Sequence, residues 1–326
     1  MPFNVFVTRR VPEAGLDILR EACDTVDVNP DDRVLSKEEL LAGVTGRDGV
    51  LCLLTDAIDA EVLDSAAGAK VFANYAVGYN NIDVEAATAR GVAVTNTPGV
   101  LTDATSDLAW ALLFSTARCI VQADRYTREG RFTGWSPMLF LGADITDRTL
   151  GIIGAGRIGT AVALKSVGFR MRVLYADPAT NETLEQEVGA QRVPLETLLA
   201  ESDFVSVHVP LMPETTHLIG ADELKRMKPS AVLVNTSRGP VVDEAALVEA
   251  LKAGAIAGAG LDVYEDEPTL APGLADLPTV TIPPHIGSAT IETRTKMATM
   301  AASNLVAALR GEVPPNCVNP TVFEDA

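Results

Sequence analysis

The stretch Thr149-Leu150-Gly151-Ile152-Ile153-Gly154-Ala155-Gly156-Arg157-Ile158-Gly159 decides the fold predicted for this chain. An apolar run comes before the first glycine of its G-x-G-x-x-G pattern, and a helix-like stretch from Thr160 to Phe169 follows the last glycine. A second apolar run, Met171 to Ala176, then ends on Asp177. Strand, glycine-rich turn, helix, strand and acid in this order are typical of a βαβ unit that binds a dinucleotide.

Each position in this pattern has a physical role. Gly154 allows the tight turn from strand to helix, Gly156 leaves room for a pyrophosphate against the backbone, and Gly159 lets helix and strand pack closely. The unpaired N–H groups at the start of the helix carry a partial positive charge that suits phosphate. Asp177 is expected to accept hydrogen bonds from the adenosine ribose and to repel a 2′-phosphate. Because Pro178 follows it instead of an arginine, we predict NAD as the cofactor, with NADP disfavoured.

The length and the charge of the chain limit its class. With 326 residues, of which 47% are hydrophobic and 21% charged, it is long enough for two domains that each bury a core. The formal net charge is −18 at pH 7, so electrostatics oppose binding to nucleic acid and to anionic membrane surfaces. No apolar stretch reaches the roughly 18 to 20 residues that span a bilayer. We therefore expect neither nucleic acid nor a membrane as a partner.

The cysteines are typical of a protein in a reducing compartment. They are widely spaced and form no C-x-x-C pair: Cys23, Cys52, Cys119 and Cys317. Cys52 lies in an apolar strand-like run and Cys119 in a predicted helix, so we expect buried free thiols. We expect no metal site. The residues from Met1 to Thr8 are predicted to form a strand and not a signal sequence, because no basic region precedes their apolar run. Cytoplasmic localisation is the resulting prediction.

Strand-like and helix-like segments alternate along most of the chain. In the first hundred residues they predict strands at 3–8, 49–54, 70–76 and 92–96, and helices at 12–23, 59–67 and 84–90. Further strands are predicted to begin at Thr149, Met171, Phe204, Ala231, Gly258 and Thr279, and a last helix covers 290–310. Such alternation gives parallel sheets with helices on both faces. The predicted fold class is α/β, with two doubly wound parallel-sheet domains: a Rossmann cofactor domain, residues 101–287, inserted into a flavodoxin-like substrate domain, residues 1–100 and 288–326.

One predicted helix is unusually long. It covers Asp103 to about Thr127 and is apolar on more than one side, through residues such as Leu108, Leu112 and Ile120. We expect such a helix to be buried partly as a connector between the domains and partly at a subunit interface. The sequence thus predicts a homodimer that forms through the 103–127 helix.

Three residues that suit hydride transfer each follow a predicted strand of the cofactor domain: Arg238, Glu267 and His285. The carboxyl ends of parallel strands share one edge of the sheet, and ligands bind at that edge. Arginine matches a substrate carboxylate with a planar fork, and histidine is the acid that titrates near neutral pH. A neighbouring glutamate would stabilise the imidazolium, so that the histidine keeps its proton until the hydride arrives. The set predicts reduction of a 2-oxo acid.

Other interpretations of the histidines stay open on the residues alone. A histidine after two prolines, as at position 285, is often only a structural loop residue. His208 alternates with strand residues and is interpreted as a core group or a cofactor-edge group, whereas His217 has the sequence context of a turn. Neither shows a strand-end acid partner as evident as Glu267. Glu265 and Asp266 remain rival acids to Glu267 at this point.

Together these features resemble the D-isomer-specific 2-hydroxyacid dehydrogenases, and most closely their glyoxylate/hydroxypyruvate reductase branch. The similarity covers essentially the whole chain. Besides the glycine pattern and the three candidate residues, it rests on two stretches: Asn74-Tyr75-Ala76-Val77-Gly78-Tyr79-Asn80-Asn81-Ile82-Asp83 and Thr95-Asn96-Thr97-Pro98-Gly99-Val100-Leu101-Thr102-Asp103-Ala104-Thr105. The stretch Trp135-Ser136-Pro137-Met138-Leu139-Phe140-Leu141-Gly142 is similar to the reductase pattern in which an aromatic residue closes the active site of a neighbouring subunit.

The resemblance implies a role for each site residue. Arg238 would bind the substrate carboxylate, His285 would donate the proton, and Glu267, the acid directly before Pro268, would pair with His285. The implied substrate contacts in the other domain are the backbone N–H groups of Val77 and Gly78. The implied cofactor contacts, beyond the glycines and Asp177, are Arg157, Ile158, Pro210, Thr215, Thr236, Ser237, Arg238, Asp262, His285 and Gly287.

The resemblance therefore predicts an NAD(H)-dependent reductase of small 2-oxo acids, glyoxylate or hydroxypyruvate first, that forms D-2-hydroxy acids. Formate dehydrogenases carry glutamine where Glu267 stands, and phosphite dehydrogenases typically carry lysine where Val77 stands, which argues against both. NADP-using reductases of the branch tend to have a basic residue at the position of Pro178. Two alternatives stay open. One is a phosphoglycerate-type dehydrogenase, and the other is a corepressor-like protein that senses a dinucleotide without turning it over.

Overall fold

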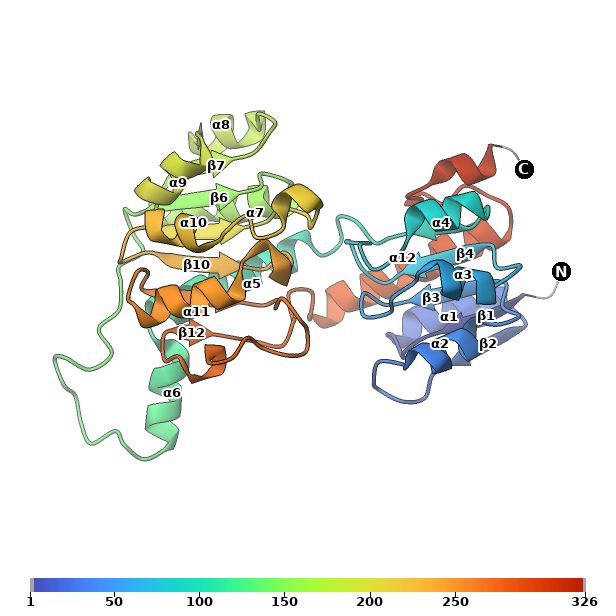
Figure 1. Cartoon of the computed structure of the whole chain (residues 1–326), viewed down its shortest axis with the longest axis horizontal. Coiled ribbons are helices and arrows are strands. Elements are labelled where there is room, and N and C mark those ends of the chain that lie inside the picture. The colour runs from blue at the N-terminus through green and yellow to red at the C-terminus, as the bar shows by residue number, and fades with distance from the viewer. Residues whose placement is uncertain (1–2, 325–326) are drawn as a thin grey trace. The chain divides into compact units, whose positions relative to one another are not determined.

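The computed structural model describes residues 3–324, which divide into two compact units. Within the described residues, the first unit comprises 3–101 and 288–324, and the second comprises Thr102–Gly287. Each unit has its own parallel sheet with helices on both faces (Figure 1). The predicted fold class, α/β with two doubly wound parallel-sheet domains, is confirmed.

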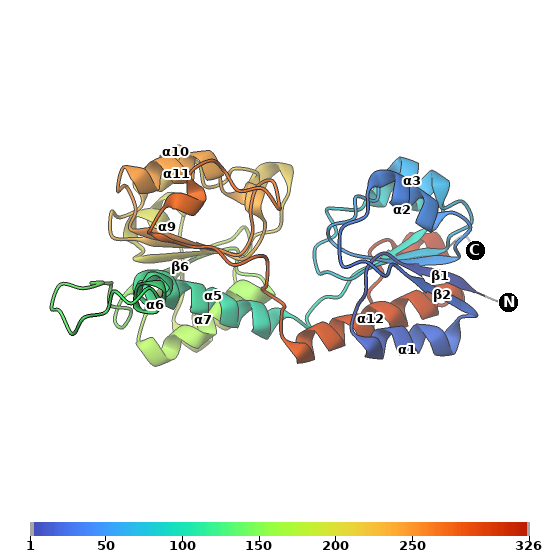
Figure 2. The same cartoon turned by 90° about the horizontal axis from the view of Figure 1, so that it is seen from below.

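The first unit contains a parallel sheet in the order β2-β1-β3-β4-β5, which is the flavodoxin-like order. The strands are β1 Asn4–Val7, β2 Thr25–Val28, β3 Gly49–Cys52, β4 Val71–Asn74 and β5 Ala93–Thr95. Figure 2 shows α1 and α12 on one face and α2 and α3 on the other. The helices are α1 Glu13–Ala22, α2 Lys37–Val44, α3 Ala60–Ser65, α4 Val84–Ala89 and α12 Ile291–Leu309.

Successive strand residues of this unit enter opposite cores. Val5 and Val7 of β1 pack with Leu16 of α1 and Leu305 of α12, whereas Phe6 enters the core that α2, α3 and α4 cover. Because both faces are covered, the central strands are mainly apolar. The carboxyl ends of β1, β3 and β4 therefore emerge from a rigid base, and the loops that follow these strands are held by it.

The second unit contains a parallel sheet in the order β12-β11-β10-β9-β6-β7-β8. The strands are β6 Thr149–Ile153, β7 Arg172–Ala176, β8 Gln191–Arg192, β9 Phe204–Val207, β10 Val232–Asn235, β11 Gly258–Leu261 and β12 Val280–Thr281. The helices are α5 Thr102–Ala117, α6 Ile120–Arg128, α7 Arg157–Lys165, α8 Glu182–Val188, α9 Leu195–Glu201, α10 Ala221–Arg226 and α11 Glu244–Lys252. After β6 the chain adds β7 on one side of β6, and it later adds β9 on the other side. The order of the strands therefore reverses between β6 and β9, and sheets of this kind bind ligands at such a switch point.

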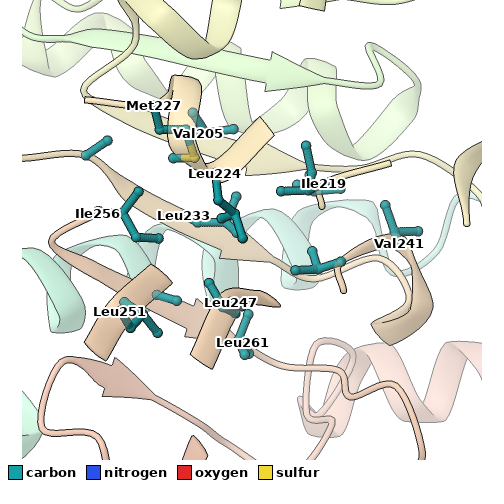
Figure 3. Packing of buried hydrophobic residues seen from close by; sticks show 14 of the residues in the cluster. Val205, Ile219, Leu224, Met227, Leu233, Val241, Leu247, Leu251, Ile256 and Leu261 are labelled. Carbon is teal, nitrogen blue, oxygen red and sulfur yellow. The ribbon is translucent and has the colours of Figure 1, made fainter. Parts of the chain in front are cut away.

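The core of the second unit lies on both faces of this sheet. On one face, Leu224 of α10 and Leu247 and Leu251 of α11 pack against Leu233 and Leu261 (Figure 3). On the other face, α5, α7 and α8 cover a second apolar cluster. Both faces together hold the strand ends in fixed positions, so residues that follow neighbouring strands are brought close to one another.

The single helix predicted for 103–127 is wrong. Helix α5 ends at Ala117 and α6 begins at Ile120, because Cys119 adopts a left-handed conformation with φ +53°. The N–H of Ala143 donates to the carbonyl of Ala117 at 2.8 Å, in the place of a continuing helical turn. Apolar composition alone does not reveal such a break, since both helices are rich in apolar residues.

The cysteines are all free thiols. Cys52 is buried in β3 as predicted. Cys119 is only half-buried and lies between two helices, so the prediction of a buried helical thiol is wrong for this residue. Cys23 and Cys317 are likewise half-buried. Across residues 3–324, none of the helices has both the length and the apolar composition that a membrane span requires.

Candidate functional site

The glycine-rich turn joins β6 to α7 and leaves an open face. Gly154 has φ +90°, and a Cβ there would lie 2.8 Å from the backbone of His208. A Cβ on Gly159 would lie 2.1 Å from the carbonyl oxygen of Gly154, so only glycine allows α7 to approach β6 this closely. A Cβ on Gly156, by contrast, would meet no protein atom within 4 Å. The fold does not require glycine at 156, and the open space there suits a group from outside the chain.

Helix α7 begins at Arg157 with no side chain capping its first N–H groups. Asp177, directly after β7, faces the same turn. Its Oδ2 accepts a hydrogen bond from the N–H of Ala155 at 2.9 Å, and its Oδ1 accepts one from the N–H of Ala179 at 2.8 Å. Each carboxylate oxygen keeps a further lone pair for a ribose hydroxyl. The predicted residues of the dinucleotide turn are thus gathered at the carboxyl ends of β6 and β7.

An arginine that the sequence reasoning did not identify lies beside this acid. Arg192 of β8 donates from Nε to the carbonyl of Asp177 at 2.9 Å and from Nη2 to the carbonyl of Pro178 at 2.5 Å. It is exposed, and it reaches this position because β8 pairs with β7 in parallel register. A cation is therefore held at the backbone of Asp177 and Pro178, although none follows the acid in the sequence.

His285 and Glu267 form a hydrogen-bonded pair. The Nδ1 of His285 lies 2.9 Å from Oε2 and 3.1 Å from Oε1 of Glu267. Glu267 comes from the loop after β11, and His285 follows β12, the neighbouring strand. With Nδ1 donating to the carboxylate, Nε2 is left as the group that meets a ligand. His285 has φ +53°, a left-handed conformation that non-glycine residues rarely adopt and that is enriched at functional sites.

The environment keeps Glu267 ionised. Burial raises the pKa of its carboxyl group, but the hydrogen bond and charge of His285, the N–H of Tyr264 and the charge of Arg238 together outweigh burial and lower the pKa below its usual 4.5. The Tyr264 N–H donates to Oε1 at 3.1 Å. A carboxylate at neutral pH therefore faces the imidazole of His285.

Arg238 follows β10 in a tight turn. Asn235, which is 1% exposed, organises this turn: its Nδ2 donates to the carbonyl of Arg238 at 3.0 Å, and its Oδ1 accepts from the N–H of Ser237 at 3.0 Å. Burial lowers the pKa of the guanidinium, while the negative charge of Glu267 opposes this effect. The structure brings all three predicted catalytic residues to one edge of the sheet. Asn235 was missed, because a buried asparagine at a strand end gives no signal of its own.

Asp262 fixes the loop that carries His285. It is 1% exposed, and its two carboxylate oxygens accept hydrogen bonds from the N–H groups of Ile286 and Gly287, both at 2.7 Å. Burial raises the pKa of Asp262, and these two N–H groups and the charge of His285 partly offset this. The residue was predicted to lie near the nicotinamide, and in the structure its side chain holds the backbone on the carboxyl side of His285.

Comparison with known proteins identifies the family of this chain. The model of the NAD-binding domain of D-isomer specific 2-hydroxyacid dehydrogenases matches residues 110–287. A glyoxylate reductase of Korarchaeum cryptofilum is 54% identical over 98% of this chain and 97% of its own length. The chain belongs to the D-isomer specific 2-hydroxyacid dehydrogenases. The predicted family and its glyoxylate reductase branch are both confirmed, and the chain is therefore an enzyme with a nicotinamide dinucleotide cofactor.

Solved structures extend the similarity to this dehydrogenase. The TT0316 protein of Thermus thermophilus superposes with a TM-score of 0.90 at 46% identity, over 97% of this chain and 99% of that one. An NADPH-dependent glyoxylate/hydroxypyruvate reductase of Sinorhizobium meliloti superposes with a TM-score of 0.85 at 32% identity, over 99% and 98%. The solved structures thus include a reductase that uses NADPH.

Thr236 and Thr215 are both predicted cofactor contacts, but their hydroxyl groups differ in whether they already have hydrogen-bond partners in the protein. Thr236 is buried, and within residues 3–324 its Oγ1 has no hydrogen-bond partner, so it is available to a ligand. The hydroxyl of Thr215 is instead used within its own loop: it donates to the carbonyl of Pro210 at 2.7 Å and accepts from the N–H of Met212 at 2.8 Å. Together with the open space at Gly156, the free Thr236 hydroxyl fits a bound dinucleotide.

The expectation that His217 lacks an evident acid partner is wrong. Its Nε2 lies 2.5 Å from Oε1 of Glu265. His217 adopts φ +52°, and its N–H donates to the carbonyl of Pro240, so a turn brings it to an acid 48 positions later in the sequence. The rival acids are thereby separated, because Glu265 pairs with His217 and Glu267 pairs with His285. Asp266 is exposed.

The lowered pKa of His208 leads us to predict that the stability of the dehydrogenase depends on pH. Its Nε2 lies 2.8 Å from Oγ of Ser206, its Nδ1 is enclosed, and burial lowers its pKa from 6.5 to about 3. Because the folded-state pKa is the lower one, protons favour the unfolded chain; stability is complete above pH 6.5 and falls as the pH drops toward 3. The free energy of unfolding of the wild type should fall between pH 7 and pH 4, and we expect His208→Gln to make this fall smaller by up to about 3 kcal/mol. Urea unfolding of the apo-protein at stepped pH measures it.

The exposed His217 provides the control for this measurement. His217→Gln removes an exposed histidine from the same unit and should not relieve the loss of stability at low pH. If the curves of wild type and His208→Gln run parallel from pH 7 to pH 4, the explanation through the enclosed Nδ1 of His208 is incorrect.

Proposed function

We propose that this dehydrogenase reduces small 2-oxo acids of the glyoxylate/hydroxypyruvate type to D-2-hydroxy acids with NADH. The observation that carries the proposal is the His285–Glu267 hydrogen bond of 2.9 Å at the same sheet edge as the dinucleotide turn. A histidine held by a carboxylate at one nitrogen is suited to donate a proton from the other. A bound nicotinamide supplies the hydride.

The proposed roles follow from the chemistry of each side chain. The guanidinium of Arg238 binds the substrate carboxylate and so orients the 2-oxo group. His285 donates its Nε2 proton to the carbonyl oxygen as the alkoxide develops, and the ionised Glu267 stabilises the imidazolium before that step. In the first unit, the backbone N–H groups of Val77 and Gly78 are proposed as further donors to the carboxylate. The two units accordingly serve as a substrate-binding and a cofactor-binding domain.

A substrate panel tests this function. Glyoxylate, hydroxypyruvate, pyruvate and phosphohydroxypyruvate are each reduced with NADH and with NADPH, and kcat/KM is compared. The proposal expects the first two to give the highest values. A preference for phosphohydroxypyruvate would favour the phosphoglycerate-type dehydrogenase. Tight NADH binding without any turnover would favour a corepressor-like protein that senses the dinucleotide.

The proposed preference for NADH depends on the charge of Asp177. Asp177→Asn keeps an oxygen that accepts from the N–H of Ala155 but removes the charge that repels a 2′-phosphate. We expect the ratio of kcat/KM for NADH to that for NADPH to fall roughly tenfold, because about 1.4 kcal/mol of repulsion is lost. Steady-state kinetics with both cofactors measure this ratio.

Two variants serve as controls for cofactor choice. Glu182→Gln removes one negative charge from the exposed start of α8 and should leave the ratio unchanged. Arg192→Gln removes the cation that is bound to the backbone carbonyl of Asp177 and should lower any residual NADPH activity. An Asp177→Asn enzyme that still discriminates as the wild type does would contradict the role of the carboxylate.

We also propose that the chain forms a homodimer through α6 and the segment 129–142. In the single chain no residue of α6 is buried, and large apolar side chains are exposed along both elements: Ile120, Val121, Phe132, Trp135, Met138 and Leu141. Trp135 is 85% exposed. A patch of this kind suits a second copy of the chain. Light scattering after gel filtration measures the mass, and a monomer at micromolar concentration contradicts the proposal.

The four free thiols agree with a reducing compartment, and we propose the cytoplasm. Cell fractionation followed by immunodetection tests this location, and enrichment in an oxidising compartment would contradict it.

A further inference from the structure

The loop after β4 is held through its backbone carbonyls by two asparagine side chains. The Nδ2 of Asn96 donates to the carbonyl of Val77 at 2.7 Å, and the Nδ2 of Asn74 donates to the carbonyl of Gly78 at 2.9 Å. Asn74 closes β4 and is fully buried. Asn96 follows β5, the strand next to β4 in the sheet. Both donors therefore come from the rigid carboxyl edge of the sheet.

Fixing a carbonyl also fixes the N–H of the same peptide. In a trans peptide the C=O and the N–H point in opposite directions, so the Asn96 bond to the carbonyl of Val77 turns the N–H of Gly78 away from Asn96. The carbonyl of Ala76 accepts from the N–H of Thr97 at 2.8 Å, and this orients the N–H of Val77 in the same way. Among residues 3–324, neither the Val77 nor the Gly78 N–H has a hydrogen-bond partner. Two neighbouring donors are thus fixed and left available for an anion.

The backbone of Asn96 is itself held by hydrogen bonds on both sides. Its N–H donates to the carbonyl of Asn316 at 3.3 Å, and its own carbonyl accepts from Nδ2 of Asn304 at 3.2 Å. Asn304 is 2% exposed and belongs to α12. With its backbone fixed on both sides, Asn96 binds the loop from a fixed main-chain position, so the two N–H groups are organised before a ligand arrives.

We propose that Asn96 and Asn74 are positioning residues for the 2-oxo acid carboxylate. Asn96 holds the peptide that carries the N–H of Gly78, and Asn74 supports it by holding the next peptide through the carbonyl of Gly78, so that the loop keeps the N–H groups of Val77 and Gly78 facing the ligand. This inference depends on the proposed function, because the ligand of these N–H groups is the substrate carboxylate. It adds two side chains, neither of them predicted from the sequence as a site residue, to the determinants of substrate affinity.

Substitutions at Asn96 test the clamp by kinetics. Asn96→Ala removes the donor, and Asn96→Asp keeps the shape but offers no N–H and adds a negative charge. We expect KM for glyoxylate to rise about tenfold in the first variant and at least as much in the second. The turnover number and the Kd of NADH should stay within about twofold, since the cofactor turn belongs to the other unit. A side chain that only fills space would leave Asn96→Asp like the wild type.

Asn319→Ala is the matched control. Asn319 is 6% exposed in the same unit, and its Nδ2 donates to Thr88 and to the carbonyl of Val92, both at 2.9 Å. Its loss should lower stability at least as much as that of Asn96 while leaving KM unchanged. If both variants raise KM equally, or if Asn96→Ala leaves it unchanged in an active enzyme, the clamp does not position the substrate.

A second readout separates this inference from the proposed function. Hydrogen–deuterium exchange of the apo-protein reports on residues 75–82 without any substrate. Asn96→Ala should accelerate exchange in this segment, whereas Asn319→Ala should not. If exchange is faster in Asn96→Ala but the wild-type protein reduces no 2-oxo acid, the proposed substrate is wrong and the positioning of the loop by Asn96 is still supported. Unchanged exchange would overturn the clamp itself.

Discussion

Replacement of His285 by glutamine is expected to lower kcat for glyoxylate reduction by about 10²- to 10⁴-fold, which is the usual contribution of a positioned proton donor. Glutamine retains a polar side chain of similar reach but has no acidic proton at the position of Nε2. The Kd of NADH should change little, because the glycine turn and Asp177 are separate from this side chain. Steady-state kinetics and fluorescence titration with NADH measure the two quantities.

The second histidine–glutamate pair supplies a control for this experiment. His217 lies 2.5 Å from Glu265 in the same unit, so His217→Gln breaks a contact at least as short as the 2.9 Å contact of His285. Yet His217 is exposed, and its acid is not the one that Arg238 influences. Its kcat should remain within a few-fold of the wild type. Equal losses in both variants would mean that the pair at His285 supports structure and not proton transfer.

Glu267→Gln refines the same test. The glutamine still offers an oxygen to Nδ1 of His285, but it removes the negative charge that stabilises the imidazolium. In the wild type the pKa of Glu267 lies below 4.5, so its charge persists at neutral pH and is lost only as the pH falls through that lowered value. We expect the variant to lose kcat at neutral pH, but less than His285→Gln does. A variant with wild-type kcat from pH 5 to pH 8 would show that the charge is not used.

The candidate site was predictable where strand ends carry it. Arg238, Glu267 and His285 each follow an apolar segment, and parallel strands bring their carboxyl ends to one edge whatever the details of the loops. Asp177 was predictable for the same reason. The His217–Glu265 pair was not, because it depends on a left-handed turn at His217 that no residue pattern near it indicates.

Edge strands and side-chain clamps escaped sequence reasoning for a different reason. Arg192 reaches Asp177 through β8, a two-residue strand at the edge of the sheet whose residues are both exposed, so no apolar run reveals it. Strand β2 alternates exposed and half-buried residues and was likewise missed. Asn96 acts through a single 2.7 Å bond to a backbone carbonyl. Contacts of this kind depend on the register between strands, which a single sequence does not specify.

The break between α5 and α6 shows the same limit in a helix. Apolar residues continue from Leu112 to Ile120 at helical spacing, and periodicity therefore predicted one element. Helix α5 ends where a residue distant in sequence binds it, since the N–H of Ala143 donates to the carbonyl of Ala117. The capping box of Ser36 and Glu39 at the start of α2 is the opposite case. Its local S-x-x-E pattern was available in the sequence and could have identified a helix that was missed.

Replacement of Arg238 by alanine is expected to raise KM for glyoxylate by about 10²- to 10³-fold. The guanidinium is half-buried and desolvation lowers its pKa, and a bound carboxylate would bring an opposite charge to it in a bidentate contact. Losing a partly buried, charge-assisted bidentate contact costs about 3 to 4 kcal/mol, which corresponds to that change in affinity. Initial rates at saturating NADH over a wide range of glyoxylate concentrations measure it.

Arg238 also lowers the pKa of Glu267, so its removal acts on the proton donor as well as on binding. Arg238→Lys separates the two effects. Lysine keeps a positive charge near Glu267 but loses the planar fork that matches a carboxylate, so kcat should recover toward the wild type while KM remains well above it. Added guanidinium ion should restore part of the activity of Arg238→Ala and none of that of His285→Gln. If KM is unchanged in both arginine variants, the substrate carboxylate is bound elsewhere, and the donors at Val77 and Gly78 become the main site for it.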